Sequence, residues 1–206
     1  MLDTTNLLSV ALAFLVVTAS PGPANIAVAT VAMSWGRRAG LLFGAGLAAG
    51  LAFWGVIAAT GLGALLQGSA QALTALKIAG GLYLLWLALI SGRSALKPSS
   101  REAATLRQGR WFRRGLLLNL SNPKAVVAWM AALSMGFGAG DSVPQVFAAM
   151  TICVLIGCFT YAGHAMAFSL PGAMTAYRRL RRWIDGAVAG LFAIAGLGLI
   201  RSAVSR

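Results

Sequence analysis

The sequence has few charged residues. Only 10% of its 206 residues are charged and four are acidic, whereas 59% are hydrophobic and the mean hydropathy is +0.80. A soluble domain averages about 25% charged residues, so this chain has too little polar surface to cover a globule in water. These values exclude a soluble enzyme, a disordered tail and a collagen-like fibre. They indicate an integral membrane protein.

Cysteine and histidine are also scarce, with two cysteines and one histidine. Cys153 and Cys158 fall in one predicted helix, on different faces, and are typical of small buried hydrophobic residues. A membrane thiol electron-transfer protein needs two sulfurs that meet. A metal-cation exporter needs carboxylate or thiolate ligands inside its bundle. Both classes stay open as alternatives to a transporter of organic solutes, and an intramembrane enzyme, which needs a nucleophile and a base, is less favoured still.

Uncharged runs predict six transmembrane helices in a single domain, residues 1–206. The three longest runs each exceed the ~20 residues that cross a bilayer. Leu-, Ala- and Gly-rich sequence without strict alternation argues against a transmembrane β-barrel. The predicted helices cover about residues 5–34, 39–66, 71–91, 115–138, 144–170 and 183–203.

The basic residues predict the orientation of these helices. Of 17 Lys and Arg, 13 fall in the first, third and fifth loops, and basic loops stay in the cytoplasm. We therefore expect a multi-pass protein of the bacterial inner membrane with both termini periplasmic. The net charge of +13 is then explained by the membrane topology and does not indicate a nucleic-acid partner. The expected partner of the protein's apolar surface is the lipid bilayer. The 13 residues are Arg37, Arg38, Arg93, Lys97, Arg101, Arg107, Arg110, Arg113, Arg114, Arg178, Arg179, Arg181 and Arg182.

An internal repeat relates the two halves of the chain. The pattern S-x-G-x-x-A-G occurs at residues 34–40 and again at 134–140, and at the same offset Pro23 matches Pro123. A repeat of three helices inverts its second copy, as in many secondary transporters. We expect a 3+3 inverted repeat, with residues 1–92 and 115–206 joined by a cytoplasmic loop at about 93–114.

Proline motifs interrupt the first and fourth predicted helices. Residues 20–25 read SPGPAN and residues 119–124 read NLSNPK, and proline inside a helix removes a hydrogen bond and clashes with the preceding turn. At 1.5 Å per residue, Pro23 and Pro123 lie roughly 21 Å and 14 Å from the nearest cytoplasmic arginine. The hydrocarbon is about 30 Å thick, so both breaks are expected near its middle, where unwound backbone must face protein or a watery cavity.

The two breaks predict a site for an amino acid. Pro23 and Pro123 each begin a half-helix, and Asn122 is a suitable N-cap for the second. Two positively polarised N-termini would meet at mid-membrane, where Lys124 adds a full charge for a carboxylate, while the carbonyl ends of the preceding half-helices suit an ammonium. The core lacks carboxylates, which favours neutral substrates, and no cofactor or metal is called for. The predicted substrate-binding residues are Pro21, Gly22, Pro23, Asn25, Asn122, Pro123 and Lys124.

Two further titratable residues are candidates for a proton relay. His164 is the only histidine, and Asp185 lies in the first turn of the last predicted helix. The structural alternatives are a hydrogen-bonded packing histidine and a carboxylate that balances the helix dipole and Arg181.

Glycines at spacings of four residues predict close helix packing. They permit close crossing, with dimerisation to a homodimer or a rocking motion as the functional alternative. The ladder in the second predicted helix comprises Gly36, Gly40, Gly44, Gly46 and Gly50, and a shorter ladder in the last helix comprises Gly186 and Gly190.

Taken together, these motifs resemble the LysE/RhtB family of bacterial amino-acid exporters. The resemblance rests on Ser20-Pro21-Gly22-Pro23-Ala24-Asn25, on the glycine-rich segment 36–50 and on Asn122-Pro123-Lys124, and with the length and six spans it covers nearly the whole chain. Ala24 departs from the family's usual Pro-Gly-Pro-Asn. The resemblance implies a secondary active exporter of amino acids or similar metabolites, driven by the proton gradient, and not an enzyme.

Overall fold

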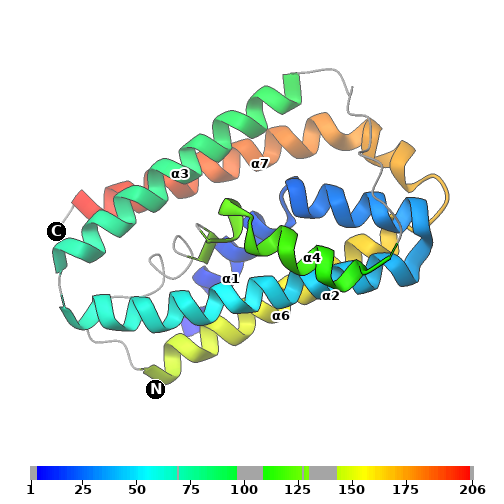
Figure 1. The fold of residues 1–206 in the computed structure, drawn as a ribbon. Helices are drawn as coiled ribbons and strands as arrows, with labels where there is room; N and C mark the ends of the chain where they lie inside the picture. Colours follow the sequence, from blue (N-terminus) through cyan, green and yellow to red (C-terminus); the bar gives the residue numbers. More distant parts are fainter. Residues whose placement is uncertain (1–3, 69, 97–108, 127, 130–142, 205–206) are drawn as a thin grey trace.

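Helices joined by short turns make up the part of the protein that the computed structural model describes, which comprises residues 4–68, 70–96, 109–126, 128–129 and 143–204 (Figure 1). No strand occurs within these ranges. The helices are α1 (Thr4–Ala19), α2 (Pro23–Gly68), α3 (Ala70–Leu96), α4 (Trp111–Leu120), α6 (Val143–Ala167) and α7 (Ala173–Val204).

The long helix α2 reverses its direction at Gly36. This residue has φ 81° and ψ 174°, a conformation open to glycine but strained for other residues. The first stretch of α2 continues the direction of α1, and the second runs back across the molecule (Figure 1). Gly36 was expected to pack against a helix, but a Cβ placed on it would meet nothing within 4 Å. That expectation was wrong because Gly36 makes a turn.

Glycines set how closely α2 approaches its two neighbours. A Cβ on Gly46 would clash with the Phe112 carbonyl oxygen of α4, and one on Gly115 of α4 would clash with the Phe43 carbonyl oxygen of α2. On the other side, a Cβ on Gly44 would lie 3.4 Å from Cβ of Tyr161 in α6. Helix α2 is therefore held backbone to backbone against α4 and in close contact with α6.

The ladder residue Gly40 also lies in close contact, because a Cβ there would be 2.8 Å from Cβ of Ala32 in the first stretch of the same helix. Helices α3 and α7 form a separate long pair (Figure 1), in which a Cβ on Gly81 would lie 2.9 Å from the Gly196 carbonyl oxygen. The pair does not use the predicted ladder of Gly186 and Gly190, which have nothing within 4 Å.

Several helix boundaries differ from the predicted ones, most of all that of α7. It begins at Ala173 and not at 183, so Arg181 and its neighbouring arginines lie in a helix and not in a loop. Within α7, Arg181 pairs with Asp185 one turn later (Nε to Oδ2, 3.4 Å). A tertiary contact adds to this, because Arg181 Nη2 also donates to Ser94 Oγ of α3 (2.7 Å). Helix α4 begins at Trp111, and the end of the predicted helix 115–138 lies outside the described residues.

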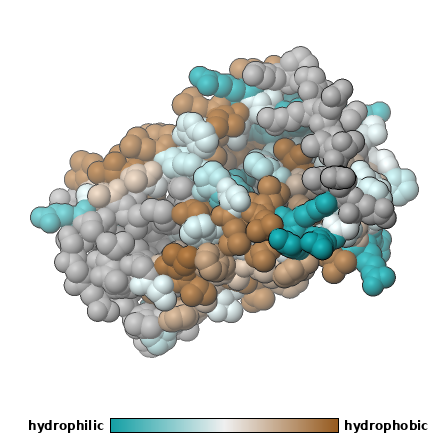
Figure 2. All heavy atoms as spheres, viewed as in Figure 1, coloured by the Kyte–Doolittle hydropathy of each residue, from teal (hydrophilic) through white to brown (hydrophobic). Residues whose placement is uncertain are grey.

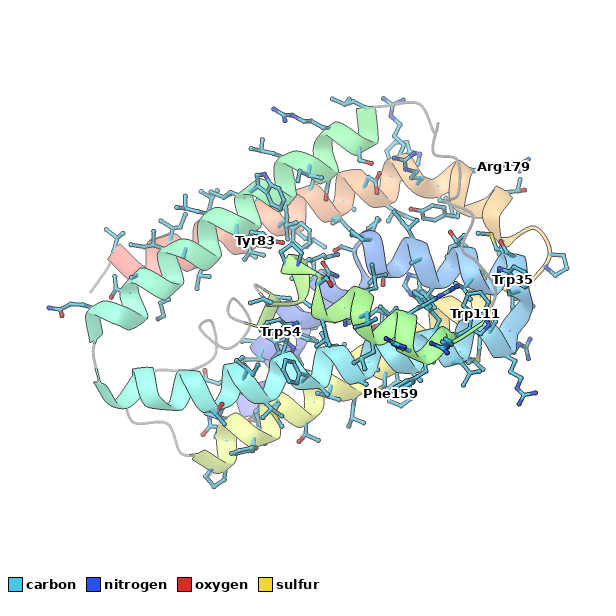
Figure 3. The ribbon with its side chains drawn as sticks, in the orientation of Figure 1. Trp35, Trp54, Tyr83, Trp111, Phe159 and Arg179 are labelled. Atoms are coloured by element: carbon cyan, nitrogen blue, oxygen red, sulfur yellow. The ribbon has the colours of Figure 1, made fainter. Side chains whose placement is uncertain are left out.

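Four helices of the described ranges are long and apolar enough to cross a membrane, and α1 is a shorter apolar helix. Large side chains such as Phe53, Trp86 and Phe159 point outward and are at least half exposed, and hydrophobic residues cover much of the visible surface (Figure 2). Such a surface suits lipid and not water. Interfacial aromatic and basic side chains gather at one end, where Trp35, Trp111 and Arg179 lie (Figure 3).

The α2–α4 crossing gives the first testable prediction. Gly115→Ala should destabilise the protein by about 1–3 kcal/mol. The added methyl group would clash with backbone atoms, which cannot move aside by changing rotamer as a side chain can. Gly186→Ala is the matched control, since the same change there meets open space and should be neutral or slightly stabilising. Thermal unfolding in detergent measures both variants. Equal unfolding midpoints for the two would contradict a backbone contact at this crossing.

Candidate functional site

The two helix breaks lie against each other. Between α1 and α2 the chain leaves the helix at Ser20–Gly22, and after α4 it does so at Ser121 and Asn122 before helical residues resume at Pro123. Lys124 Nζ donates a hydrogen bond to the Ser20 carbonyl oxygen (2.9 Å) and another to Ser20 Oγ (2.5 Å). A single side chain thus joins two motifs that are about a hundred residues apart in the sequence.

The first break is held by side chains that donate to its backbone. Pro21 has no N–H group for the Val17 carbonyl, and Ser20 Oγ donates to that oxygen instead (2.7 Å). Asn25 Nδ2 donates to the carbonyl oxygens of Thr18 (2.7 Å) and Ser20 (2.9 Å). Asn25 was predicted to bind substrate; its Nδ2 donors are directed at the backbone of the break, and the residue also lines the pocket described below.

The second break has the N-cap that the sequence predicts. Asn122 Oδ1 accepts a hydrogen bond from the Lys124 backbone N–H (3.1 Å), and the Ala125 N–H donates to the Asn122 carbonyl (3.0 Å). Pro123 occupies the first helical position, where its missing N–H costs nothing. The positive end of this half-helix therefore lies at the second break, and the Lys124 ammonium extends from its first turn to Ser20.

A buried amide connects the second break to α2 and α6. Asn119 is fully buried; its Nδ2 donates to the Leu47 carbonyl (2.6 Å) and to Tyr161 Oη (3.4 Å), and its Oδ1 accepts from Asn122 Nδ2 (3.4 Å). Burying an amide without partners is costly, so these contacts fix the amide in one orientation. Asn119 and Tyr161 were not predicted as site residues; the available signal was a polar side chain inside an otherwise apolar helix.

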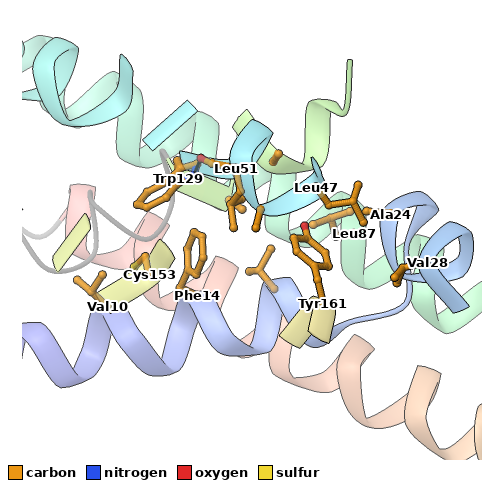
Figure 4. Close-up of a cluster of buried hydrophobic side chains, with 14 of the residues drawn as sticks. Val10, Phe14, Ala24, Val28, Leu47, Leu51, Leu87, Trp129, Cys153 and Tyr161 are labelled. Carbon is orange, nitrogen blue, oxygen red and sulfur yellow. Dashed lines mark hydrogen bonds between the residues drawn. The ribbon is translucent and has the colours of Figure 1, made fainter. Parts of the chain in front are cut away.

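An aromatic pair packs the half-helix that begins at Pro123 against α1. Trp129 has no exposed surface; its Nε1 donates to the Leu51 carbonyl (2.9 Å), one helical turn along α2 from the Leu47 carbonyl. Its ring lies 4.6 Å, centroid to centroid, from that of Phe14 in α1 (Figure 4). The half-helix after Pro123 is thereby anchored to α1 and α2 at once.

A small pocket lies between these elements. The volume of this cavity is only about 20 Å³, and one water molecule needs roughly 10–15 Å³. The pocket in this conformation therefore has room for water but not for an amino acid, and the Lys124 side chain fills part of the space between the breaks. Its walls are Val17, Thr18, Gly22, Ala24, Asn25, Leu51, Asn122, Lys124, Ala125, Ala128 and Tyr161.

The two candidate relay residues bond within their own helices. His164 Nδ1 lies 2.8 Å from the Thr160 carbonyl oxygen, which can only accept, so Nδ1 carries the proton. Asp185 is almost fully buried on α7 and pairs with Arg181. Within the described ranges neither residue lines the pocket, and no interaction joins them to each other.

The cysteines and other possible metal ligands lie apart from the pocket. Cys153 is buried and Cys158 is exposed, both on α6, and both are free. Across the residues with described positions, no three His, Cys, Asp or Glu side chains come together in a group that could hold a metal ion.

The glycine of the first break gives a prediction about Lys124. A Cβ on Gly22 would lie 2.9 Å from Lys124 Nζ and 3.3 Å from its Cδ. The flexible lysine must then move, so Gly22→Ala should break its bonds to Ser20 and destabilise the fold by about 1–3 kcal/mol. The chain has only three lysines, so ¹⁵N-lysine NMR resolves the Lys124 ammonium, assigned with Lys124→Met. An unchanged signal in Gly22→Ala, as expected for the control Gly186→Ala, would contradict this packing.

Comparison with known proteins places the chain in a family. The LysE type translocator family matches residues 15–203. The threonine efflux protein of Escherichia coli (strain K12) is 34% identical over 202 residues, which cover 95% of this chain and 97% of that protein. The threonine efflux protein of Salmonella typhi is 35% identical over 204 residues, 94% of this chain and 97% of its own.

A further relative is the homoserine/homoserine lactone efflux protein of Salmonella typhimurium (strain LT2), 33% identical over 168 residues, which cover 81% of this chain and 78% of the relative. No solved structure is significantly similar to the chain. The family match spans both helix breaks, the glycine-rich α2 and the paired helices α3 and α7. The chain is thus a multi-pass membrane transporter, not an enzyme, and belongs to the LysE type translocator family.

Proposed function

We propose that this translocator exports small neutral amino acids across the bacterial inner membrane by alternating access, and that it binds them between its two helix breaks. Relatives at about a third identity are threonine and homoserine efflux proteins. No acidic side chain lines the described pocket, so a second positive charge on the substrate would have no partner there. Neutral amino acids therefore suit the residues that line the pocket better than lysine or arginine does.

We further propose that the chain crosses the membrane six times as two inverted repeats, with both termini periplasmic. Three observations support this topology. Helix α1 and the first stretch of α2 continue one another across the molecule, Gly36 then reverses the chain, and the breaks fall at matching places in the two halves (Figure 1). The basic and aromatic end that holds Trp35 and Arg179 would face the cytoplasm.

The contact between Lys124 and Ser20 carries the proposal. The Ser20 carbonyl is an acceptor left by the broken helix, and the Lys124 ammonium donates to it. An amino acid brings an ammonium of its own together with a carboxylate. On binding, the substrate ammonium takes the Ser20 carbonyl, and the Lys124 ammonium turns to the substrate carboxylate beside the half-helix N-terminus.

This exchange keeps every buried charge partnered at each stage. In the conformation described above, Lys124 bonds to Ser20 and the pocket is small. With substrate, each charged group has an opposite charge or a dipole, which is required where an unpaired charge is costly. Because the lysine lies in one repeat and the serine in the other, binding and release change the contact between the repeats. That coupling is what alternating access needs.

The first test of the proposed function replaces the lysine by an uncharged side chain of similar length. Lys124→Met should lower threonine export about 10- to 100-fold, because a charge-assisted bond worth about 1.5–3 kcal/mol is lost. The variant should stay folded, because removing a buried charge relieves a desolvation cost that offsets part of the roughly 1–3 kcal/mol lost with the bonds to Ser20. Export of labelled threonine and homoserine from purified protein in proteoliposomes measures this.

The control for that experiment is Arg201→Gln, which removes an exposed positive charge from the end of α7 and should leave export unchanged. Protein-free liposomes give the leak. Normal export by Lys124→Met would refute the proposed role of the lysine. No export of either amino acid by the unmodified protein would refute the choice of substrate.

Export is proposed to be coupled to the proton gradient, with His164 and Asp185 as the relay. The buried carboxylate of Asp185 and the free Nε2 of His164 are two groups able to take and release a proton within the described helices. The Arg181–Asp185 pair also contacts α3 through Ser94, so protonation of Asp185 would loosen the α3–α7 pair.

Asp185→Asn and His164→Gln test this coupling. Export by the unmodified protein should accelerate when a pH gradient is imposed on the proteoliposomes. The relay variants should keep threonine exchange at equal pH but lose that acceleration, because the proton site is gone while the pocket is intact. An acceleration retained in both variants would show that neither residue carries the proton.

A further inference from the structure

We infer that Tyr161 is a specificity-determining residue, whose phenolic O–H donates a hydrogen bond to a hydroxyl group on the side chain of the transported amino acid. This inference rests on the proposed function, because it assigns the part of the pocket that binds the substrate side chain. The ammonium and carboxylate are accounted for by Ser20 and Lys124, and the substrate side chain must lie against the remaining wall.

The position of Tyr161 follows from close helix packing. Gly44 has no side chain, so the backbone of α6 approaches α2 at this level: a Cβ on Gly44 would lie 3.4 Å from both Cβ and the carbonyl oxygen of Tyr161. The Tyr161 ring then extends from α6 toward α2 near Leu47 (Figure 4). It is 4% exposed and lines the pocket.

The hydrogen bonds around Tyr161 show that its phenolic oxygen accepts from Asn119, which leaves its O–H free to donate elsewhere. Asn119 Oδ1 already accepts from Asn122, so its Nδ2 is the atom that faces Tyr161. An amide nitrogen only donates, so the Tyr161 oxygen accepts there. Within the described ranges the Tyr161 proton has no acceptor, and a buried donor without a partner is costly. A ligand hydroxyl in the pocket would supply that acceptor.

The other residues that line the pocket are mostly apolar, so the Tyr161 O–H can distinguish substrates that carry a hydroxyl group from those that do not. Val17, Leu51, Ala125 and Ala128 contribute apolar surface. Thr18 lies at the carbonyl end of α1, beside the acceptors assigned to the substrate ammonium. Threonine and valine have nearly the same shape and differ by a hydroxyl in place of a methyl group. An apolar pocket separates such a pair poorly, whereas a directed hydrogen bond favours the hydroxyl strongly.

The test compares threonine with valine in Tyr161→Phe. Export of each labelled amino acid from proteoliposomes gives a threonine-to-valine ratio, which should fall about three- to tenfold with little change for valine. Phenylalanine preserves the ring, and Asn119 Nδ2 keeps its bond to the Leu47 carbonyl, so the variant should fold. Tyr83→Phe on α3 is the control, because it removes a phenolic hydroxyl outside the pocket and should leave the ratio unchanged.

The outcomes separate this inference from the proposed function. A ratio that is unchanged while the unmodified protein exports threonine would refute the role of Tyr161 and leave the proposed function standing. An equal loss for threonine and valine would make Tyr161 a structural residue and also refute the inference. Export of neither amino acid by the unmodified protein would refute the proposed substrate class itself.

Discussion

The contact on which the rest of the structure depends joins the Lys124 ammonium to Ser20. It places a charge from one half of the chain on a carbonyl exposed by a broken helix in the other half. A lone charge or an unpaired carbonyl in an apolar interior is costly, so each break needs the other. The positions of α1 and of the half-helix that begins at Pro123 follow from this mutual requirement, as does the small size of the pocket.

Glycine makes that contact geometrically possible. Gly22 leaves space for the lysine stem over the first break, and Gly46 and Gly115 let α2 and α4 touch backbone to backbone. Helices in a membrane gain nothing from hydrophobic attraction to one another, because lipid is equally apolar, and small residues compensate by permitting close packing. The buried amides Asn25 and Asn119 then satisfy carbonyl oxygens of the first break and of α2. The site is thus a set of backbone groups made available by proline and held in place by asparagine.

The sequence predicted the local features well because their causes are local. Proline within residues 20–25 and 119–124 breaks a helix whatever surrounds it, and Asn122 caps the next one through a bond that spans two residues. Apolar runs predicted membrane helices, and the motifs at residues 20–25, 36–50 and 122–124 predicted the family. The start of α7 was missed because its arginines looked like a loop, although Arg181 pairs within the helix and with Ser94 of α3. Gly36 looked like a packing residue because a spacing of four cannot distinguish a helix contact from a turn.

The sequence alone therefore determined the class of protein, because hydropathy is a property of composition. It also determined the two helix breaks and the cap at the second one, because proline and asparagine act on backbone groups within a few residues. Tertiary structure alone decided which atoms meet. It showed that Lys124 bonds to Ser20, that Asn25 faces backbone and that Asn119 links Leu47 to Tyr161. These contacts join residues from 7 to 104 positions apart. The longer ones depend on how close glycine lets the helices come, a distance that no local pattern encodes.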